Sequence, residues 1–228
     1  MLKVRQLFDS ESSTYTYIVY DDIALEGVVI DPVFTQAQRD LQLIQDLGLD
    51  IKYVCETHIH ADHITSCGKL AEHLKAEVVI SQNANIENPL IAANANSLQF
   101  GSQSLDIIHT PGHTPTCICF YAQGYVFTGD TLLIRKCGRT DFQGGSSAEL
   151  FKSVHERLFA LPDDTTVYPG HDYTGQTSST IGEEKKYNKR LNLSISQAQF
   201  VGIMESLNLP YPKRMDEAVP ANLKLGMV

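Results

Sequence analysis

Many of the hydrophobic residues of this chain fall into short runs, most of which are followed by a polar residue or proline. Runs of three to eight residues rich in valine, isoleucine and aromatic residues are typical of β-strands. The sequence predicts strands at residues 4–8, 14–20, 26–30, 51–55, 77–80, 105–108, 117–121, 125–127 and 166–168. We expect the runs at 117–121 and 125–127 to form a hairpin around Gln123 and Gly124.

Helical spacing appears between several of these runs. Ala37, Leu41, Ile44 and Leu47 recur at intervals of three or four residues, and Gly48 suits the end of a helix. The same reasoning predicts helices at residues 35–47, 64–74, 147–160, 179–190 and 194–207, and an irregular connection at 83–96. Strands that alternate with helices predict an α/β (α+β) fold. Because no linker or repeat interrupts the pattern, we expect one domain over residues 1–228, with a short helical C-terminal extension.

Composition and charge narrow the functional class. The 228-residue chain carries a formal net charge of -9, which argues against nucleic acid or an anionic membrane as its main partner. No apolar run approaches the length of a membrane span, and the N-terminus lacks an apolar signal core. The 5 cysteines include no Cys-x-x-Cys pair, so we expect a reducing, cytoplasmic setting, or the mitochondrial matrix for a processed eukaryotic chain.

The most informative stretch is a cluster of metal-type donors directly after the predicted strand at 51–55. His58, His60, Asp62 and His63 place three imidazoles and a carboxylate within six residues. Imidazole and carboxylate are the usual ligands of zinc and non-haem iron. The alternative is a polar loop that happens to be rich in histidine. That explanation would suit a single histidine, but it accounts poorly for three imidazoles crowded beside a carboxylate.

Three further donors follow predicted strands. His113 lies in Pro-Gly-His-Thr, Asp130 in Thr-Gly-Asp and His171 in Pro-Gly-His. Strands that lie side by side bring such ends to one edge of a sheet. The pattern therefore predicts a metal site at the edge of a mixed sheet.

These motifs, in this order and spacing, resemble those of the metallo-β-lactamase superfamily over nearly the whole chain. Asp31, which follows a predicted strand, also fits, and we expect it to hold the His58 loop by hydrogen bonds. The resemblance implies a four-layer αββα sandwich with a metal at the edge of two packed sheets. Thr116 departs from the pattern, since glycine usually follows Pro-Gly-His-Thr-Pro, and we expect only a local change of turn there.

Two families within the superfamily compete. One is the ETHE-like family of glutathione persulfide dioxygenases (sulfur dioxygenases), and the other is the hydroxyacylglutathione hydrolases, which are glyoxalase II-like. The stretches at residues 133–143, 168–175 and 208–222 resemble the dioxygenases. Glyoxalase II sequences typically have Glu at the position of Asp172 and a longer helical C-terminal domain. The resemblance therefore favours the dioxygenase.

The two families use the same residues differently. Resemblance to the dioxygenase implies one Fe(2+) per chain, bound by His58, His113 and Asp130. His60, Asp62, His63 and His171 would then orient those ligands or, in a dinuclear zinc hydrolase, bind metal themselves with Asp130 as the bridge. Spacing by itself does not choose between these sets.

The dioxygenase reading implies the oxidation of glutathione persulfide by O2 to sulfite and glutathione. Arg139 is a candidate for binding the substrate, because a guanidinium binds a carboxylate bidentately. Its alternative is an ion pair with Asp141 that shapes the loop. Tyr173 is expected to reach the cleft and contact the substrate. A homodimer is compatible with this class of protein.

Two hypotheses come from other classes. A metal-bearing regulatory module without turnover would have lost some of the ligands that this chain retains. A rhodanese-type sulfur carrier would need a loop centred on a reactive cysteine, and the sequence contains no obvious one.

Overall fold

The computed structural model describes residues 1–84, 86, 96–212 and 214–227. The chain divides into two compact units, which are described separately. The first unit comprises Met1–Asp106 and Pro212–Val228, and the second comprises Ile107–Tyr211. The C-terminal residues thus belong to the same unit as the N-terminal half. The expectation of a single domain over residues 1–228 stays a prediction.

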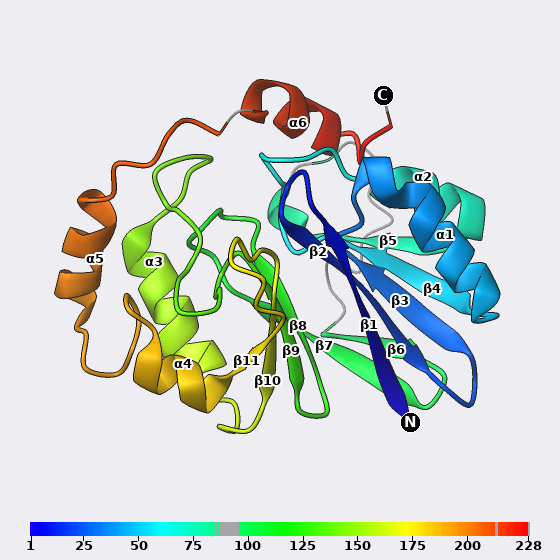
Figure 1. Cartoon of the computed structure of the whole chain (residues 1–228), viewed down its shortest axis with the longest axis horizontal. Coiled ribbons are helices and arrows are strands. Elements are labelled where there is room, and N and C mark those ends of the chain that lie inside the picture. The colour runs from blue at the N-terminus through cyan, green and yellow to red at the C-terminus, as the bar shows by residue number, and fades with distance from the viewer. Residues whose placement is uncertain (85, 87–95, 213, 228) are drawn as a thin grey trace. The chain divides into compact units, whose positions relative to one another are not determined.

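A five-stranded mixed sheet forms the centre of the first unit, in the order β1-β2-β3-β4-β5 (Figure 1). The first three strands pair in antiparallel fashion, whereas β4 and β5 continue the sheet in parallel with β3. The bounds are Leu2–Asp9 for β1, Thr14–Asp21 for β2, Glu26–Ile30 for β3, Asp50–Cys55 for β4 and Glu77–Val79 for β5.

Two helices make the crossovers between the parallel strands. Helix α1 (Ala37–Asp46) joins β3 to β4, and α2 (Cys67–Leu74) joins β4 to β5. Their apolar faces, including Ile44 and Leu70, pack with sheet residues such as Val54 in one buried cluster. Each such fully buried side chain contributes about 1.5–3 kcal/mol. The carboxyl ends of β3 and β4 are thereby fixed, and the His58 loop begins at the end of β4.

Two elements of the first unit were not predicted. Strand β6 (Ser97–Phe100) pairs in antiparallel fashion with β7 (Gln103–His109), and β7 leads into the second unit. Helix α6 (Met215–Asn222) follows near the C-terminus and contains Pro220, the kind of residue that argues against a helix from sequence.

The second unit contains the strands β8 to β11, in the order β11-β10-β9-β8. The predicted hairpin is present as β8 and β9, and β10 runs parallel to β9. The bounds are Ile118–Ala122 for β8, Tyr125–Gly129 for β9, Thr166–Pro169 for β10 and Ser179–Thr180 for β11.

Helices α3 (Ser147–Lys152) and α4 (Ile181–Tyr187) lie beside these strands, and α5 (Gln197–Glu205) packs against α3 (Figure 1). The first continues as a π-helical segment over Ser153–Leu158. Leu150 and Phe200 from the helices share a buried cluster with Val126 and Val167 from the strands.

Several predicted helices are shorter than expected, for physical reasons. The helix predicted at 64–74 begins only at Cys67, because Thr65 pairs with Val33 and bonds to Pro32 instead. The helix predicted at 179–190 begins at Ile181, because Ser179 and Thr180 form β11. The helix predicted at 194–207 spans 197–205 and is preceded by a capping box between Ser196 and Gln199. Most of the irregular connection predicted at 83–96 lies outside the described residues.

The described residues contain six α-helices in all. None of these helices combines the length and the apolar character that crossing a membrane requires.

Candidate metal centre

The histidine cluster of the first unit forms a buried loop after β4. Successive imidazoles pack against one another, with ring centroids 4.1 Å apart for His58 and His60 and 4.4 Å apart for His60 and His63. Donor atoms of His60, Asp62 and His63 lie within 4.8 Å of one another. Residues 56–66 have no helix or extended strand of their own. Backbone hydrogen bonds hold the two ends of this loop, at Glu56 and at residues 64–66, and side-chain hydrogen bonds support the rest.

Asp31 fixes the start of this loop, as the sequence predicts. Its carboxylate accepts hydrogen bonds from the backbone N–H and the hydroxyl of Thr57, both at 2.7 Å. The Thr57 oxygen also lies 3.0 Å from Nδ1 of His58. Because the Thr57 proton goes to Asp31, Nδ1–H of His58 must be the donor in that contact. This tautomer carries its lone pair on Nε2, as a neutral imidazole that binds metal through Nε2 does.

Sequence reasoning missed Glu56. This fully buried residue lies between β4 and the histidines, with Oε2 at 3.1 Å from Nε2 of His60. Asp31 lies 3.3 Å from the same nitrogen. Burial alone would lower the pKa of His60, but the two carboxylates raise it well above its usual value. An acidic residue four positions before a histidine, at the end of a buried strand, is the sequence signal that would have found this pair.

In the second unit, three of the predicted residues meet at the carboxyl ends of the strands. Asp130 directly follows β9, and His171 follows β10, so these parallel neighbours bring the two side chains together. Nδ1 of His171 donates to Oδ1 of Asp130 at 2.7 Å. The other carboxylate oxygen, Oδ2, lies 3.8 Å from Nε2 of His113.

A backbone carbonyl group orients the His113 ring. Its Nδ1–H donates to the carbonyl oxygen of Arg139 at 2.6 Å, which again leaves the lone pair on Nε2. Gly138 makes this approach possible, since a Cβ there would lie 2.5 Å from the Asp130 carbonyl oxygen and 2.9 Å from the His113 ring. Within the second unit, His113 and Asp130 are thus close enough for one ion to contact both, and their chemistry suits a transition metal.

Arg139 itself is engaged within its own loop. Its guanidinium forms two hydrogen bonds of 2.7 Å with Asp141 and a third, of 2.8 Å, with the carbonyl oxygen of Pro210. The same group lies over the Phe142 ring, 4.4 Å from its centroid. These contacts support the loop-shaping alternative for Arg139.

Tyr173 follows His171 by two residues and stacks on its ring, with centroids 5.9 Å apart and planes 9° apart. Its side chain is 65% exposed. The tyrosine is therefore positioned beside the Asp130–His171 pair on the solvent side.

A buried acid supports the loop that follows Asp130. Glu184 of α4 is fully buried and accepts hydrogen bonds from the backbone N–H of Arg135 at 2.9 Å and from Asn188 at 2.8 Å. The Arg135 guanidinium also pairs with Glu184 and with Glu183. Glu183 and Glu184 thus tie Arg135, in the loop after Asp130, to helix α4.

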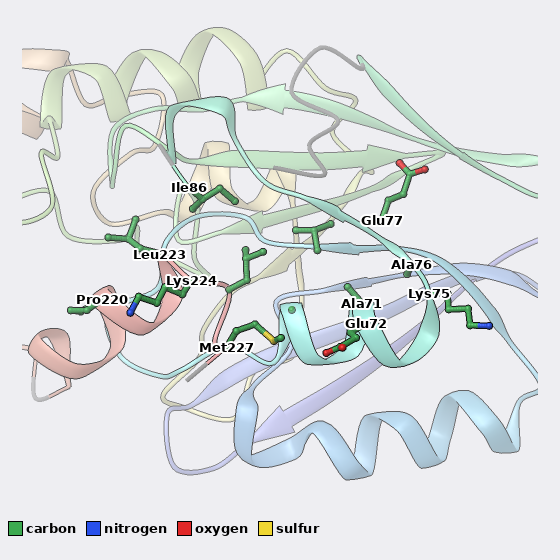
Figure 2. Close-up of a pocket in the computed structure, with 13 residues that line it drawn as sticks. Ala71, Glu72, Lys75, Ala76, Glu77, Ile86, Pro220, Leu223, Lys224 and Met227 are labelled. Atoms are coloured by element: carbon green, nitrogen blue, oxygen red, sulfur yellow. The ribbon is translucent and has the colours of Figure 1, made fainter. Parts of the chain in front are cut away.

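The first unit also contains a cavity of about 990 Å³, bounded by α2, β5 and the C-terminal residues (Figure 2). Its lining is largely apolar and includes Ala71, Val78, Leu223 and Met227. No predicted site residue is among the described residues that line it. The predicted metal donors therefore lie outside the described lining of this cavity.

The comparisons agree with the fold and the donor motifs. The model of the metallo-beta-lactamase superfamily matches residues 11–88 and 86–171. The chain belongs to this superfamily, and the predicted metallo-β-lactamase fold, with two mixed sheets and helices, is confirmed.

Two curated relatives show to which family within the superfamily the chain belongs. They are the mitochondrial persulfide dioxygenase ETHE1 of Mus musculus and that of Homo sapiens, each 47% identical over 227 residues, which cover 98% of this chain and 89% of the relative. The crystal structure of ETHE1 from Myxococcus xanthus superimposes with a TM-score of 0.94 at 47% identity, covering 98% of this chain and 99% of that one. Within the superfamily, the chain is thus a member of the ETHE1 persulfide dioxygenase family.

Proposed function

We propose that this protein is a persulfide dioxygenase, an oxidoreductase that converts glutathione persulfide, O2 and water into glutathione and sulfite. The observation that carries the proposal is the 47% identity to mammalian persulfide dioxygenases over 98% of the chain. The reaction balances: the terminal sulfur gains three oxygens, two from O2 and one from water. The S–S bond breaks, and glutathione leaves as the thiol.

We assign His58, His113 and Asp130 as the ligands of one Fe(2+) per chain. The first residue belongs to the first unit, and the other two belong to the second. Two imidazoles and one carboxylate are the donor set of non-haem iron oxygenases, so the bound metal would supply the activation of O2. The Nδ1–H tautomers that Thr57 and Arg139 impose on the two histidines support this assignment.

The surroundings of His60 support one metal ion instead of two. In a dinuclear zinc hydrolase of the glyoxalase II type, His60 would be a metal ligand. Here its Nε2 lies within 3.3 Å of both Asp31 and Glu56. These carboxylates give His60 acidic neighbours of its own within the first unit, which supports a role in holding the loop. His63, whose Nδ1 lies 2.9 Å from Asp62, would support the same loop, and His171 would orient Asp130.

Tyr173 is our candidate for direct contact with the substrate. Its exposure and its stacking on His171 support a phenol that hydrogen-bonds the glutathione persulfide beside the metal ligands. Arg139 contributes by holding the loop whose carbonyl oxygen orients His113. The reaction would take place in a reducing compartment, either the cytoplasm or the mitochondrial matrix. The two mammalian relatives are mitochondrial proteins by name.

The test is O2 uptake by protein reconstituted with Fe(II) and given glutathione persulfide, with lactoylglutathione hydrolysis measured in parallel. We expect uptake with one sulfite formed per O2, one iron per chain and loss of uptake in His113→Ala. The matched control is His73→Ala, which removes an exposed imidazole from the last turn of α2 and should leave uptake unchanged. Thioester hydrolysis with two metals per chain and no uptake would replace the proposal with the hydrolase.

A further inference from the structure

The histidine loop is fastened by a residue about 160 positions further along the chain. Asn222, the last residue of α6, is fully buried in the first unit. Its Nδ2 donates hydrogen bonds of 2.8 Å to the carbonyl oxygens of both His60 and His63. Its Oδ1 accepts a hydrogen bond of 2.9 Å from the backbone N–H of Thr65. One side chain thus satisfies three backbone groups of a loop that has no ladder of its own.

The residues that follow Asn222 pack the C-terminal segment against the start of α2. The backbone N–H of Gly68 donates to the carbonyl oxygen of Leu225 at 2.9 Å. Gly226 adopts a φ of +70°, and a Cβ there would lie 1.9 Å from the Thr65 carbonyl oxygen. The Leu225 side chain packs against the core cluster that α1 and α2 share. The segment therefore fits closely against the end of the loop, and it also forms one wall of the cavity in Figure 2.

Two acids that directly follow strands of the sheet also hold the loop. Asp31 bonds Thr57 at the beginning of the loop. Glu56 accepts a short hydrogen bond from the Thr65 hydroxyl at its end. Thr65 therefore bonds to Glu56 through its hydroxyl and to Asn222 through its amide. The loop that carries His58 is clamped between the sheet and the C-terminal helix.

We propose that Asn222 is a positioning residue for metal binding, which acts through the backbone of residues 60–65 to hold the His58 loop in its binding conformation. The proposal rests on the proposed function, because His58 is the assigned ligand from this loop. Without the clamp, metal binding would have to order the loop, and the free energy lost in ordering would appear as weaker metal affinity. The role of the C-terminal segment is thus to prepare the centre, and no contact with metal or substrate is required.

The test compares three variants of the full chain. Asn222→Ala removes all three hydrogen bonds. Asn222→Asp keeps the side-chain size and the acceptor for Thr65 but replaces the N–H donors that face His60 and His63. Leu225→Ala is the matched control, because it loosens the packing of the same segment and leaves the Asn222 side chain in place. Unfolding temperature, Fe(II) affinity and amide hydrogen exchange of the metal-free protein are measured for each.

We expect both Asn222 variants to bind Fe(II) about 10–100-fold more weakly, the range typical of residues that orient metal ligands. The Thr65 amide should lose protection in metal-free Asn222→Ala. Leu225→Ala should unfold at a lower temperature but retain the affinity. Unchanged Thr65 exchange, or affinity losses no larger than that of Leu225→Ala, would overturn the clamp. Failure of the unaltered protein to bind Fe(II) would instead overturn the proposed function, because the exchange measurement needs no metal.

Discussion

His171 and Asp130 contact each other from the ends of neighbouring parallel strands, with Nδ1 of the histidine 2.7 Å from Oδ1 of the carboxylate. The other oxygen of Asp130 is turned toward His113. A carboxylate held in this way has one oxygen fixed by a donor and the second aimed at the proposed metal. The histidine therefore sets the direction of a proposed ligand.

This relationship predicts the effect of His171→Ala. If His171 orients Asp130, the variant should still bind one iron per chain, with an affinity lower by about 10–100-fold. The measurement is a titration with Fe(II) under anaerobic conditions, with His73→Ala as the control for loss of an imidazole. A change from two metals per chain to one would instead identify His171 as a ligand in a dinuclear centre.

Gly138 should not tolerate a side chain. In Gly138→Ala the new Cβ would approach the Asp130 carbonyl oxygen and the His113 ring to less than 3 Å, so the ligand loop must shift. We expect weaker Fe(II) binding and a loss of about 1–3 kcal/mol in the free energy of unfolding, measured by urea denaturation. Gly202→Ala is the control, because Gly202 lies within α5 and a Cβ there meets nothing within 4 Å. Equal behaviour of the two variants would contradict the close-packing argument.

Arg139 and Asp141 should behave as a pair. If the arginine shapes the loop, Arg139→Ala and Asp141→Asn should reduce kcat to a similar extent, with little change in KM for glutathione persulfide, because each breaks the same bidentate contact. Arg139→Lys should resemble Arg139→Ala, since an ammonium group does not reproduce the planar contact. Steady-state kinetics of the three variants decide the question. A rise in KM confined to the arginine variants would mean that Arg139 binds the substrate.

Asp40 should make stability depend on pH. Burial raises the pKa of this carboxyl from 3.8 to about 6, although the neighbouring Arg39 opposes the shift. The folded chain therefore binds more protons than the unfolded chain between these values, and the free energy of unfolding falls as pH rises through this range. Relative to the unaltered protein, Asp40→Asn should gain up to about 3 kcal/mol between pH 4 and pH 7. Urea denaturation at several pH values measures this, and a difference that is constant with pH would refute it.

Most strands and the donor motifs could be predicted because they depend on neighbours in sequence. The runs that form β2, β3 and β4 are rich in β-branched and aromatic residues, and polar residues follow each of them. Strand β6 and helix α6 escaped prediction. The first is only four residues long, and the second contains Pro220 and has no clear apolar period. Strand β6 pairs with β7, the next strand along the chain, whereas the last residue of α6, Asn222, bonds to His60 and His63 far away in the sequence.

The sequence by itself determined which donors the chain carries, that they follow strands, and to which family such an order belongs. Only the tertiary structure decided how those donors are held. Glu56 faces His60, the Arg139 carbonyl oxygen orients His113, and Asn222 spans the histidine loop. The physical reason is that hydrophobic periodicity reports which face of an element is buried. A hydrogen bond between residues 160 positions apart depends instead on where the folded backbone brings them, and no local pattern encodes that.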